Sequence, residues 1–254
     1  MKLDCVGLLL GRKGSKGLPG KNTMKILGRP ISNYSIMAAL NSKHITNLYL
    51  STDDTKIIKD AKKFDLEVIE RPDFLCTDEA LFEDALIHGY QEIIKRRNKK
   101  PDIVVILMCN VVTINNQLID DAVDALINDE RADSSVSISV LNMYSPLRAR
   151  KIDEEGYLQP FVPFESFGDP KTLSCDRDSQ GDVYFADMSH SVCRSRALDN
   201  IDNGLLPQRW MGQKIIPVYN SYGCDIDLLW QVSASEWWLK NNGFSLNQTP
   251  YKPN

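Results

Sequence analysis

Apolar runs of strand length alternate with segments of helical period over the first 140 residues, and this alternation constrains the fold most. Strands are expected at 3–10, 47–52, 102–108, 135–140 and 183–187, and helices at 32–40, 55–64, 79–96, 116–127 and 228–241. Strands that are buried on both faces of a parallel sheet appear in a sequence as continuous apolar runs. The order therefore predicts a doubly wound α/β sheet.

Two of the expected helices carry an apolar face. The third presents its apolar side chains at helical spacing, at Phe82, Ala85, Leu86, Gly89 and Ile93. Thr77 is the expected N-cap of that helix, with Asp78 and Glu79 placed favourably for its dipole. The last helix is expected to be amphipathic, and its apolar residues are Leu229, Val232, Trp237 and Leu239.

The alternation stops at about 145–180, where prolines, glycines and aromatic residues follow one another without helical period. This stretch predicts an insertion that carries a hairpin and long loops, and that serves as a lid or an oligomer contact. No linker, repeat or low-complexity segment divides the chain. Residues 1–254 are therefore expected to form a single domain with this one insertion.

Composition narrows the class of protein. The 254 residues are 43% hydrophobic and 25% charged, typical of a soluble globular protein, and a net charge of −4 disfavours a generic nucleic-acid binder. No apolar run approaches the roughly 20 residues of a membrane helix, and the N-terminal stretch lacks a signal-peptide cleavage site. The six scattered cysteines contain no C-x-x-C pair, which favours free thiols in a cytoplasmic protein.

The segment 11–22, GRKGSKGLPGKN, follows the first expected strand and combines glycines with cations. Glycines let the backbone approach a ligand closely, and the cations Arg12, Lys13, Lys16 and Lys21 would neutralise phosphate. Open α/β sheets bind ligands at the carboxyl ends of their strands, where this loop lies. Neither the Walker motif nor the G-x-G-x-x-G dinucleotide fingerprint is present, which disfavours P-loop and NAD-binding proteins. A polyphosphate is the expected ligand.

Asp225 and Asp227 form a D-I-D motif between an apolar run and the last helix. Alternate residues of an extended chain point to the same side, so both carboxylates can share one ligand, and Mg²⁺ is commonly held by two carboxylates together with phosphate oxygens. An equally good interpretation makes Asp227 the N-cap of the last helix. For Asp53 and Asp54, capping of the helix that begins at Thr55 is the favoured interpretation.

Together these segments resemble the cytidylyltransferases that activate acidic sugars, above all the CMP-sialate synthetases. The resemblance lies in LLLGRKGSKGLPGKN, NLYLSTDD, ERPDFLCTDEA and the D-I-D motif, and extends over roughly residues 3–243. It implies a Rossmann-like nucleotidyltransferase fold with a mixed central sheet and an inserted hairpin or dimerisation arm. It further implies a homodimer that uses Mg²⁺ to transfer CMP from CTP to an acidic sugar of eight or nine carbons, with release of pyrophosphate.

The resemblance also implies roles for individual residues. The catalytic residues that it implies are Arg12, Lys16, Lys21, Asp225 and Asp227, of which the two aspartates bind the metal. Nucleotide binding falls to Gly11, Arg12, Gly14, Ser15, Lys16, Gly17, Lys21, Asn22 and Arg71. Sugar binding falls to Asn110, Arg148, Gln180 and Tyr184.

The segment ILMCNVVTINN departs from the family pattern. Sialic-acid synthetases typically carry L-Q-P-T-S-P-L-R here, whereas this chain has Met108, Cys109 and Asn110, and it has Gln180 where the family has asparagine. The segments expected to bind the nucleotide thus match the family pattern, whereas those expected to bind the sugar differ from it. The alternatives are another acidic sugar, KDO-like or legionaminate-like, another nucleotide, or a non-catalytic sugar-nucleotide-binding protein.

Overall fold

The computed structural model describes residues 3–14, 17–178 and 181–251. Its centre is a seven-stranded sheet of order β11-β7-β10-β6-β1-β4-β5. The strands are β1 (Cys5–Leu10), β4 (Asn47–Thr52), β5 (Glu67–Glu70), β6 (Ile103–Met108), β7 (Ser134–Val140), β10 (Tyr184–Arg194) and β11 (Ile215–Tyr219). All neighbouring pairs are parallel except those made by β10, which runs antiparallel to β6 and β7. The predicted mixed α/β sheet is confirmed.

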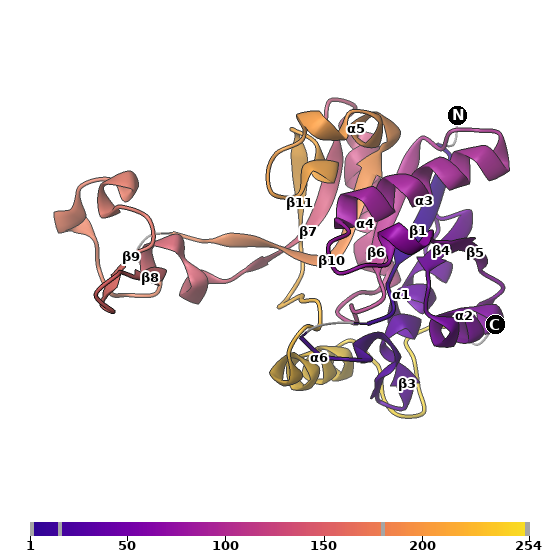
Figure 1. Cartoon of the computed structure of the whole chain (residues 1–254), viewed down its shortest axis with the longest axis horizontal. Coiled ribbons are helices and arrows are strands. Elements are labelled where there is room, and N and C mark those ends of the chain that lie inside the picture. The colour runs from indigo at the N-terminus through magenta and orange to yellow at the C-terminus, as the bar shows by residue number, and fades with distance from the viewer. Residues whose placement is uncertain (1–2, 15–16, 179–180, 252–254) are drawn as a thin grey trace.

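Helices cover both faces of this sheet (Figure 1). On one face α1 (Ile31–Leu40), α2 (Thr55–Ala61) and α4 (Asn116–Asn128) share a core with Leu9 of β1. On the other, α3 (Phe82–Arg97) and α5 (Ser195–Asp199) share a core with Leu8. Adjacent residues of β1 are thus buried in different layers, as the apolar run 3–10 predicted. No helix of the described part of the chain is long and apolar enough to cross a membrane.

The last helix, α6 (Leu229–Asn241), packs differently from the prediction. Its buried residues are Ser235, Trp238 and Leu239, which are spaced as one helical face, and the last two join a small third core around Tyr34. Leu229 is 70% exposed and Trp237 is 53% exposed. The prediction that these two residues lie on the packed face of the helix was wrong, because only one narrow stripe of the helix packs against the rest of the protein.

Two other expectations are corrected. Helix α3 begins at Phe82 after Leu81 in the N-cap position, so Thr77 does not cap it. The Thr77 carbonyl oxygen instead accepts a hydrogen bond from Arg12. Helix α2 ends at Ala61, since the chain tightens into a 3₁₀ turn that is closed by Asp65 in the left-handed region.

The sequence interpretation missed β5 and the short hairpin of β2 (Lys25–Ile26) and β3 (Arg29–Pro30).

The insertion forms an arm that extends away from the sheet (Figure 1). It leaves at the end of β7 and returns at the start of β10, where Val140 and Tyr184 are paired. The predicted hairpin is present as β8 (Arg150–Ile152) and β9 (Leu158–Pro160). Its apolar side chains lie in the open, with Ile152 and Leu158 exposed by 71% and 69%.

Candidate active site

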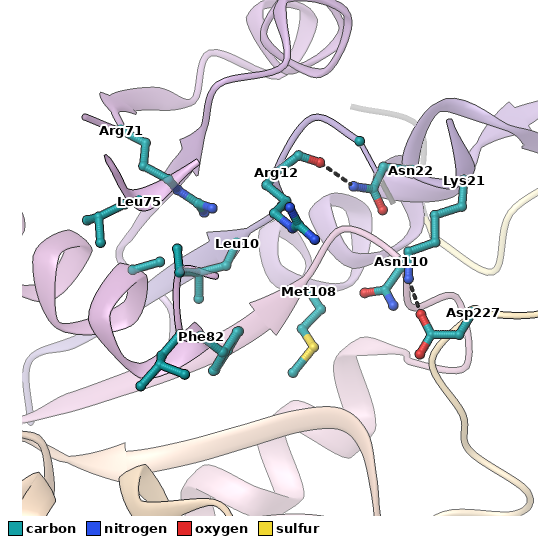
Figure 2. Close-up of a pocket in the computed structure, with 15 residues that line it drawn as sticks. Leu10, Arg12, Lys21, Asn22, Arg71, Leu75, Phe82, Met108, Asn110 and Asp227 are labelled. Atoms are coloured by element: carbon teal, nitrogen blue, oxygen red, sulfur yellow. Dashed lines mark hydrogen bonds and ion pairs between the residues drawn. The ribbon is translucent and has the colours of Figure 1, made fainter. Parts of the chain in front are cut away.

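A cavity of about 290 Å³ opens at the carboxyl ends of β1 and β6 (Figure 2). The polar side, by the glycine loop, is lined by Gly11, Arg12, Gly14, Lys21, Asn22, Asn110 and Asp227. The other side is an apolar wall with Arg71 beside it, and is lined by Leu10, Leu75, Ala80, Leu81, Phe82, Ala85 and Met108. The site thus joins a surface suited to phosphates with a wall suited to a flat apolar ring.

The glycine loop lies close to its neighbours because it has few side chains. A Cβ on Gly11 would lie 2.5 Å from the Sγ of Cys109, so only glycine lets the loop pass the end of β6. A Cβ on Gly17 would lie 2.8 Å from the backbone oxygen of Asp227. The loop is tethered where Lys13 N donates to Asp53 Oδ1 at 2.6 Å. The glycine loop and the D-I-D segment, far apart in sequence, are therefore in contact.

Among the described residues, Arg12 and Lys21 of the glycine loop and Arg71 after β5 are the cations that line the cavity. The Arg12 guanidinium donates to Asp78 Oδ1 at 2.6 Å, and the Lys21 ammonium forms an ion pair with Asp227. Arg71 donates to the backbone oxygen of Ser51 at 2.9 Å, and burial lowers the pKa of its guanidinium. Arg12 and Lys21 lie by the glycine loop, whereas Arg71 lies by the apolar wall (Figure 2).

The segment that carries the two aspartates runs antiparallel to the residues after β6. Val111 and Asp225 form a β-bridge, and Ile226 N donates to the Asn110 backbone oxygen at 2.9 Å. The Asn110 side-chain amide donates to Asp225 Oδ2 at 3.2 Å. Burial raises the pKa of the Asp225 carboxyl, and the neighbouring Asp227 carboxylate raises it further. Asn110, expected to face the sugar, thus has its amide directed to Asp225.

Asp227 is not the N-cap of the last helix. That position is Leu228, and the Gln231 Oε1 accepts hydrogen bonds from the backbone amides of Asp227 and Leu228 at 2.7 and 2.6 Å. The capping interpretation of Asp227 was wrong, because the helix begins at Leu229 with Leu228 in the N-cap position, and the Asp227 carboxylate pairs with Lys21 instead. Asp54 does cap α2, accepting from Lys56 N at 2.8 Å, whereas its neighbour Asp53 holds the glycine loop.

The donor set of the D-I-D segment fits a magnesium ion. Asp225 and Asp227 offer two carboxylates, the first of them half-buried, whose mutual repulsion a divalent cation would relieve. Within the described residues no group of three or more His, Cys, Asp or Glu side chains could hold a metal. A magnesium ion here would take its remaining ligands from phosphate oxygens and water, as is usual for Mg²⁺ at nucleotide sites.

Within one chain the structure does not bring every expected residue to this cavity. Arg148 lies in the arm, where it donates to the Cys175 backbone oxygen at 2.6 Å. Tyr184 lies at the base of the arm, with its ring edge-on to Tyr219 at 6.0 Å between centroids. Ser15, Lys16 and Gln180 lie outside the described residues.

Sequence reasoning missed a second hollow at the same edge of the sheet. This cavity of about 400 Å³ is lined by Val140, Leu141, Asn142, Met143, Arg177, Asp178, Tyr219, Asn220, Ser221 and Tyr222. Asn220 lines this cavity and lies five residues before Asp225. The signal in the sequence was YNSYG, a run of aromatic and amide side chains shortly before the two aspartates. The apolar wall was missed as well, although most of its residues lie within or just after the quoted ERPDFLCTDEA segment.

Comparisons with known proteins agree with this geometry. The chain is 31% identical over 130 residues to pseudaminic acid cytidylyltransferase of Campylobacter jejuni, covering 51% of this chain and 55% of that protein. It is 25% identical over 234 residues to N-acylneuraminate cytidylyltransferase of Oncorhynchus mykiss, covering 91% and 50%. It is 29% identical over 156 residues to CMP-N,N'-diacetyllegionaminic acid synthase of Legionella pneumophila, covering 60% of this chain and 65% of that protein. The chain thus spans about half the length of the first two relatives.

Solved structures share the fold. CMP:2-keto-3-deoxy-manno-octonic acid synthetase, solved in complex with CTP, superposes with a TM-score of 0.66 at 16% identity, covering 94% of this chain and 99% of that one. 4-Diphosphocytidyl-2C-methyl-D-erythritol synthase of Anaerococcus prevotii superposes with a TM-score of 0.60 at 14% sequence identity. The match covers 93% of this chain and 96% of that one. A family model described as cytidylyltransferase matches residues 6–155 of the 254. On that match, which spans more than half of its length, the chain belongs to the cytidylyltransferase family.

Proposed function

We propose that this protein transfers CMP from CTP to the anomeric hydroxyl of an acidic 2-keto sugar and releases pyrophosphate. The observation that carries the proposal is the contact between the glycine loop and the D-I-D segment, with Lys21 paired to Asp227 and Gly17 against its backbone. A cationic loop and a carboxylate pair at one cavity, which Asp227 lines and Asp225 adjoins through Asn110, are what a metal-dependent reaction of a nucleoside triphosphate requires.

The cationic loop would act on the phosphates. Lys21 and Arg12 would neutralise the triphosphate and the charge that develops on the leaving pyrophosphate. Arg12 would exchange Asp78 for a phosphate oxygen, because its present ion pair lies at the edge of the same cavity. The apolar wall near Arg71 would hold the cytosine ring. Since the reaction is a direct displacement, positioning and charge neutralisation account for most of the catalysis.

Asp225 and Asp227 would hold a magnesium ion, with Asn110 orienting the first of these carboxylates. When bound, Mg²⁺ polarises the α-phosphate and lowers the pKa of the attacking hydroxyl. Lys21 would turn from Asp227 to the phosphates once this ion is present. No covalent intermediate is needed, because the acceptor hydroxyl attacks the α-phosphorus directly.

The acidic sugar is supported by the relatives, whose names specify pseudaminic, N-acylneuraminic and legionaminic acid. We place it between the metal pair and the second hollow, beside Tyr184 and Tyr219. Met108 stands where sialic-acid synthetases have glutamine, which favours an acidic sugar other than sialic acid itself. Arg148 would face the sugar only in the cavity of a second copy, reached by the exposed arm of a homodimer.

Thermal shift and pyrophosphate release test this function. CTP with Mg²⁺ should raise the Tm, because a ligand that binds only the native state stabilises it, whereas NAD should not. Pyrophosphate should then appear with CTP, Mg²⁺ and one member of a panel of eight- and nine-carbon sugar acids. Stabilisation by NAD as large as that by CTP would contradict the nucleotide assignment. Tight CTP binding without pyrophosphate release for any sugar acid would favour a non-catalytic binding protein.

A further inference from the structure

We propose that Ser139 and Asp187 are positioning residues, which hold Gly223 and through it set the location of the Asp225 carboxylate. Neither residue touches the cavity, and both are almost fully buried, at 1% and 5% exposure. The inference deepens the proposed function and rests on it, since it takes Asp225 to be a metal ligand.

The first observation is a large bulge in β10. Ala186 pairs with Ile138 and Ser191 pairs with Val136, so four residues of β10 lie opposite one residue of β7. Within the bulge Met188 has a φ of 62°, a left-handed conformation that is strained for a non-glycine residue. Bulges re-aim side chains and are frequent beside active sites. Here the bulge directs the Asp187 carboxylate into the protein.

The second observation is what this carboxylate contacts. Asp187 Oδ2 accepts a hydrogen bond from the Ser139 hydroxyl at 2.7 Å, and Oδ1 accepts from the Ser189 backbone amide at 3.0 Å. The Ser139 hydroxyl in turn accepts from the Gly223 backbone amide at 2.9 Å. A Cβ on Gly223 would lie 2.3 Å from Asp187 Oδ2. The backbone two residues before Asp225 is therefore pressed against this pair.

The opposite side of the same segment is held by the residues after β6. The Cys224 backbone amide donates to the Thr113 hydroxyl at 2.9 Å. The Asn220 side-chain amide donates to the Thr113 backbone oxygen at 2.9 Å, and its Oδ1 accepts from the Trp238 indole at 3.2 Å. The segment around Gly223 and Cys224 is thus held from both sides. Loss of the Ser139 hydroxyl should therefore shift this segment away from β7 and towards Thr113.

Since Ser139 and Asp187 orient a metal-binding segment rather than the metal, their effect should appear in metal affinity. Outer partners of metal ligands typically change affinity by about 10–100-fold when they are removed. Ser139→Ala deletes the hydroxyl that connects Asp187 to Gly223. The matched control is Ser137→Ala on the same strand, which deletes an equally buried hydroxyl that has no hydrogen-bond partner within the described residues.

The experiment measures binding of Mn²⁺ alone to the full chain by electron paramagnetic resonance, together with the Mg²⁺ dependence of pyrophosphate release. We expect Ser139→Ala to raise the Mn²⁺ dissociation constant about tenfold. Excess Mg²⁺ should restore its activity, which a merely unfolded fraction would not allow. Ser137→Ala should match the wild type in both measurements. Equal Mn²⁺ affinity of the two variants would overturn the inference.

A second variant covers the case in which Ser139→Ala does not fold. Gly223→Ala keeps every hydrogen-bonding group but places a methyl against Asp187, so it should also weaken Mn²⁺ binding. Wild-type Mn²⁺ affinity in Gly223→Ala overturns the inference as well. A wild-type protein that binds Mn²⁺ but transfers no cytidylyl group contradicts the proposed function alone, because the positioning effect is measured without turnover.

Discussion

Lys21 and Asp227 form an ion pair that joins the end of the glycine loop to the segment before α6, across 206 positions of sequence. The Lys21 side chain is 12% exposed and that of Asp227 is 55% exposed, so the ammonium is enclosed while the carboxylate remains open to the cavity. The lysine ammonium is thus paired with one of the two carboxylates that a magnesium ion would bind. A ligand that brings its own negative charge and a metal would separate the pair.

Lys21→Ala should lower kcat by about 100-fold whatever sugar is offered, because the ammonium faces charge that grows in the transition state. Lys13→Ala is the matched control, since this exposed lysine of the same loop contributes its backbone amide rather than its ammonium to the structure. Steady-state kinetics with CTP and the active sugar acid measure both variants. A similar kcat for the two would show that the position of the charge is unimportant.

Asp227→Asn should lower kcat by about 100-fold or more while the fold is kept, because it removes a ligand charge at nearly constant shape. The helix loses no cap, since Leu228 is its N-cap and the Asp227 carboxylate pairs with Lys21 instead. Asp202→Asn serves as the control, a carboxylate that pairs with Arg209 on the surface. Turnover near that of the wild type in Asp227→Asn would remove Asp227 from the metal site.

Asp225 gives a stability prediction with a defined sign. Its folded-state pKa is raised, so the native state holds its proton more tightly than the unfolded chain does. The free energy of unfolding therefore falls as pH rises through the window that starts near the ordinary value of 3.8 and ends at the raised pKa. Asp225→Asn removes this cost, so the Tm of the metal-free protein at pH 7 should rise.

The rise should shrink as the pH falls through the raised pKa of Asp225, because the wild-type carboxyl then takes up a proton in the native state. The same variant should lose stabilisation by Mg²⁺ with CTP, so that stability and function change in opposite directions. Differential scanning calorimetry at pH 7 and at lower pH measures the effect. A lower Tm at pH 7 would mean that the Asn110 hydrogen bond to Asp225 outweighs the desolvation of the charge.

The arm gives a prediction about assembly. Ile152 and Leu158 are paired across the hairpin β8–β9 and lie in the open, which is costly unless another surface covers them. The double substitution Ile152→Ser and Leu158→Ser should convert a dimer to monomers while the Tm changes little. Lys151→Ser on the same hairpin is the control. Light scattering after size-exclusion chromatography measures the mass, and a wild-type monomer would contradict the proposed homodimer.

The sheet was predictable from the sequence because its central strands are buried on both faces and therefore carry continuous apolar runs. Leu8 and Leu9, for example, belong to different layers and are both fully buried. Strand β5 was missed, since only Ile69 of its four residues is buried. The packed face of α6 was likewise not predictable, because only Ser235, Trp238 and Leu239 of this helix are buried.

The candidate site was predictable where chemistry is concentrated in short segments, as in the glycine loop and the D-I-D motif. It was not predictable where a role depends on distant partners. Asn110 contacts Asp225 across 115 positions, and Gly223 depends on Asp187 in a bulge that no local pattern marks. Similarly, Asp227 has the features of a cap, and only the start of the helix at Leu229 and the distant partner Lys21 show that it is not one.

The arm begins and ends at neighbouring positions of one ladder, because Val140 and Tyr184 are paired. To the sheet, residues 141–183 are therefore an enlarged hairpin loop, and a short turn in their place would leave the pairing of β7 with β10 unchanged. The entropy of closing such a loop grows only slowly with its length. Replacement of the arm by that of a relative should thus leave the sheet and the cavity at β1 and β6 unchanged, and on the proposed function it would alter assembly and sugar choice without altering the nucleotide chemistry.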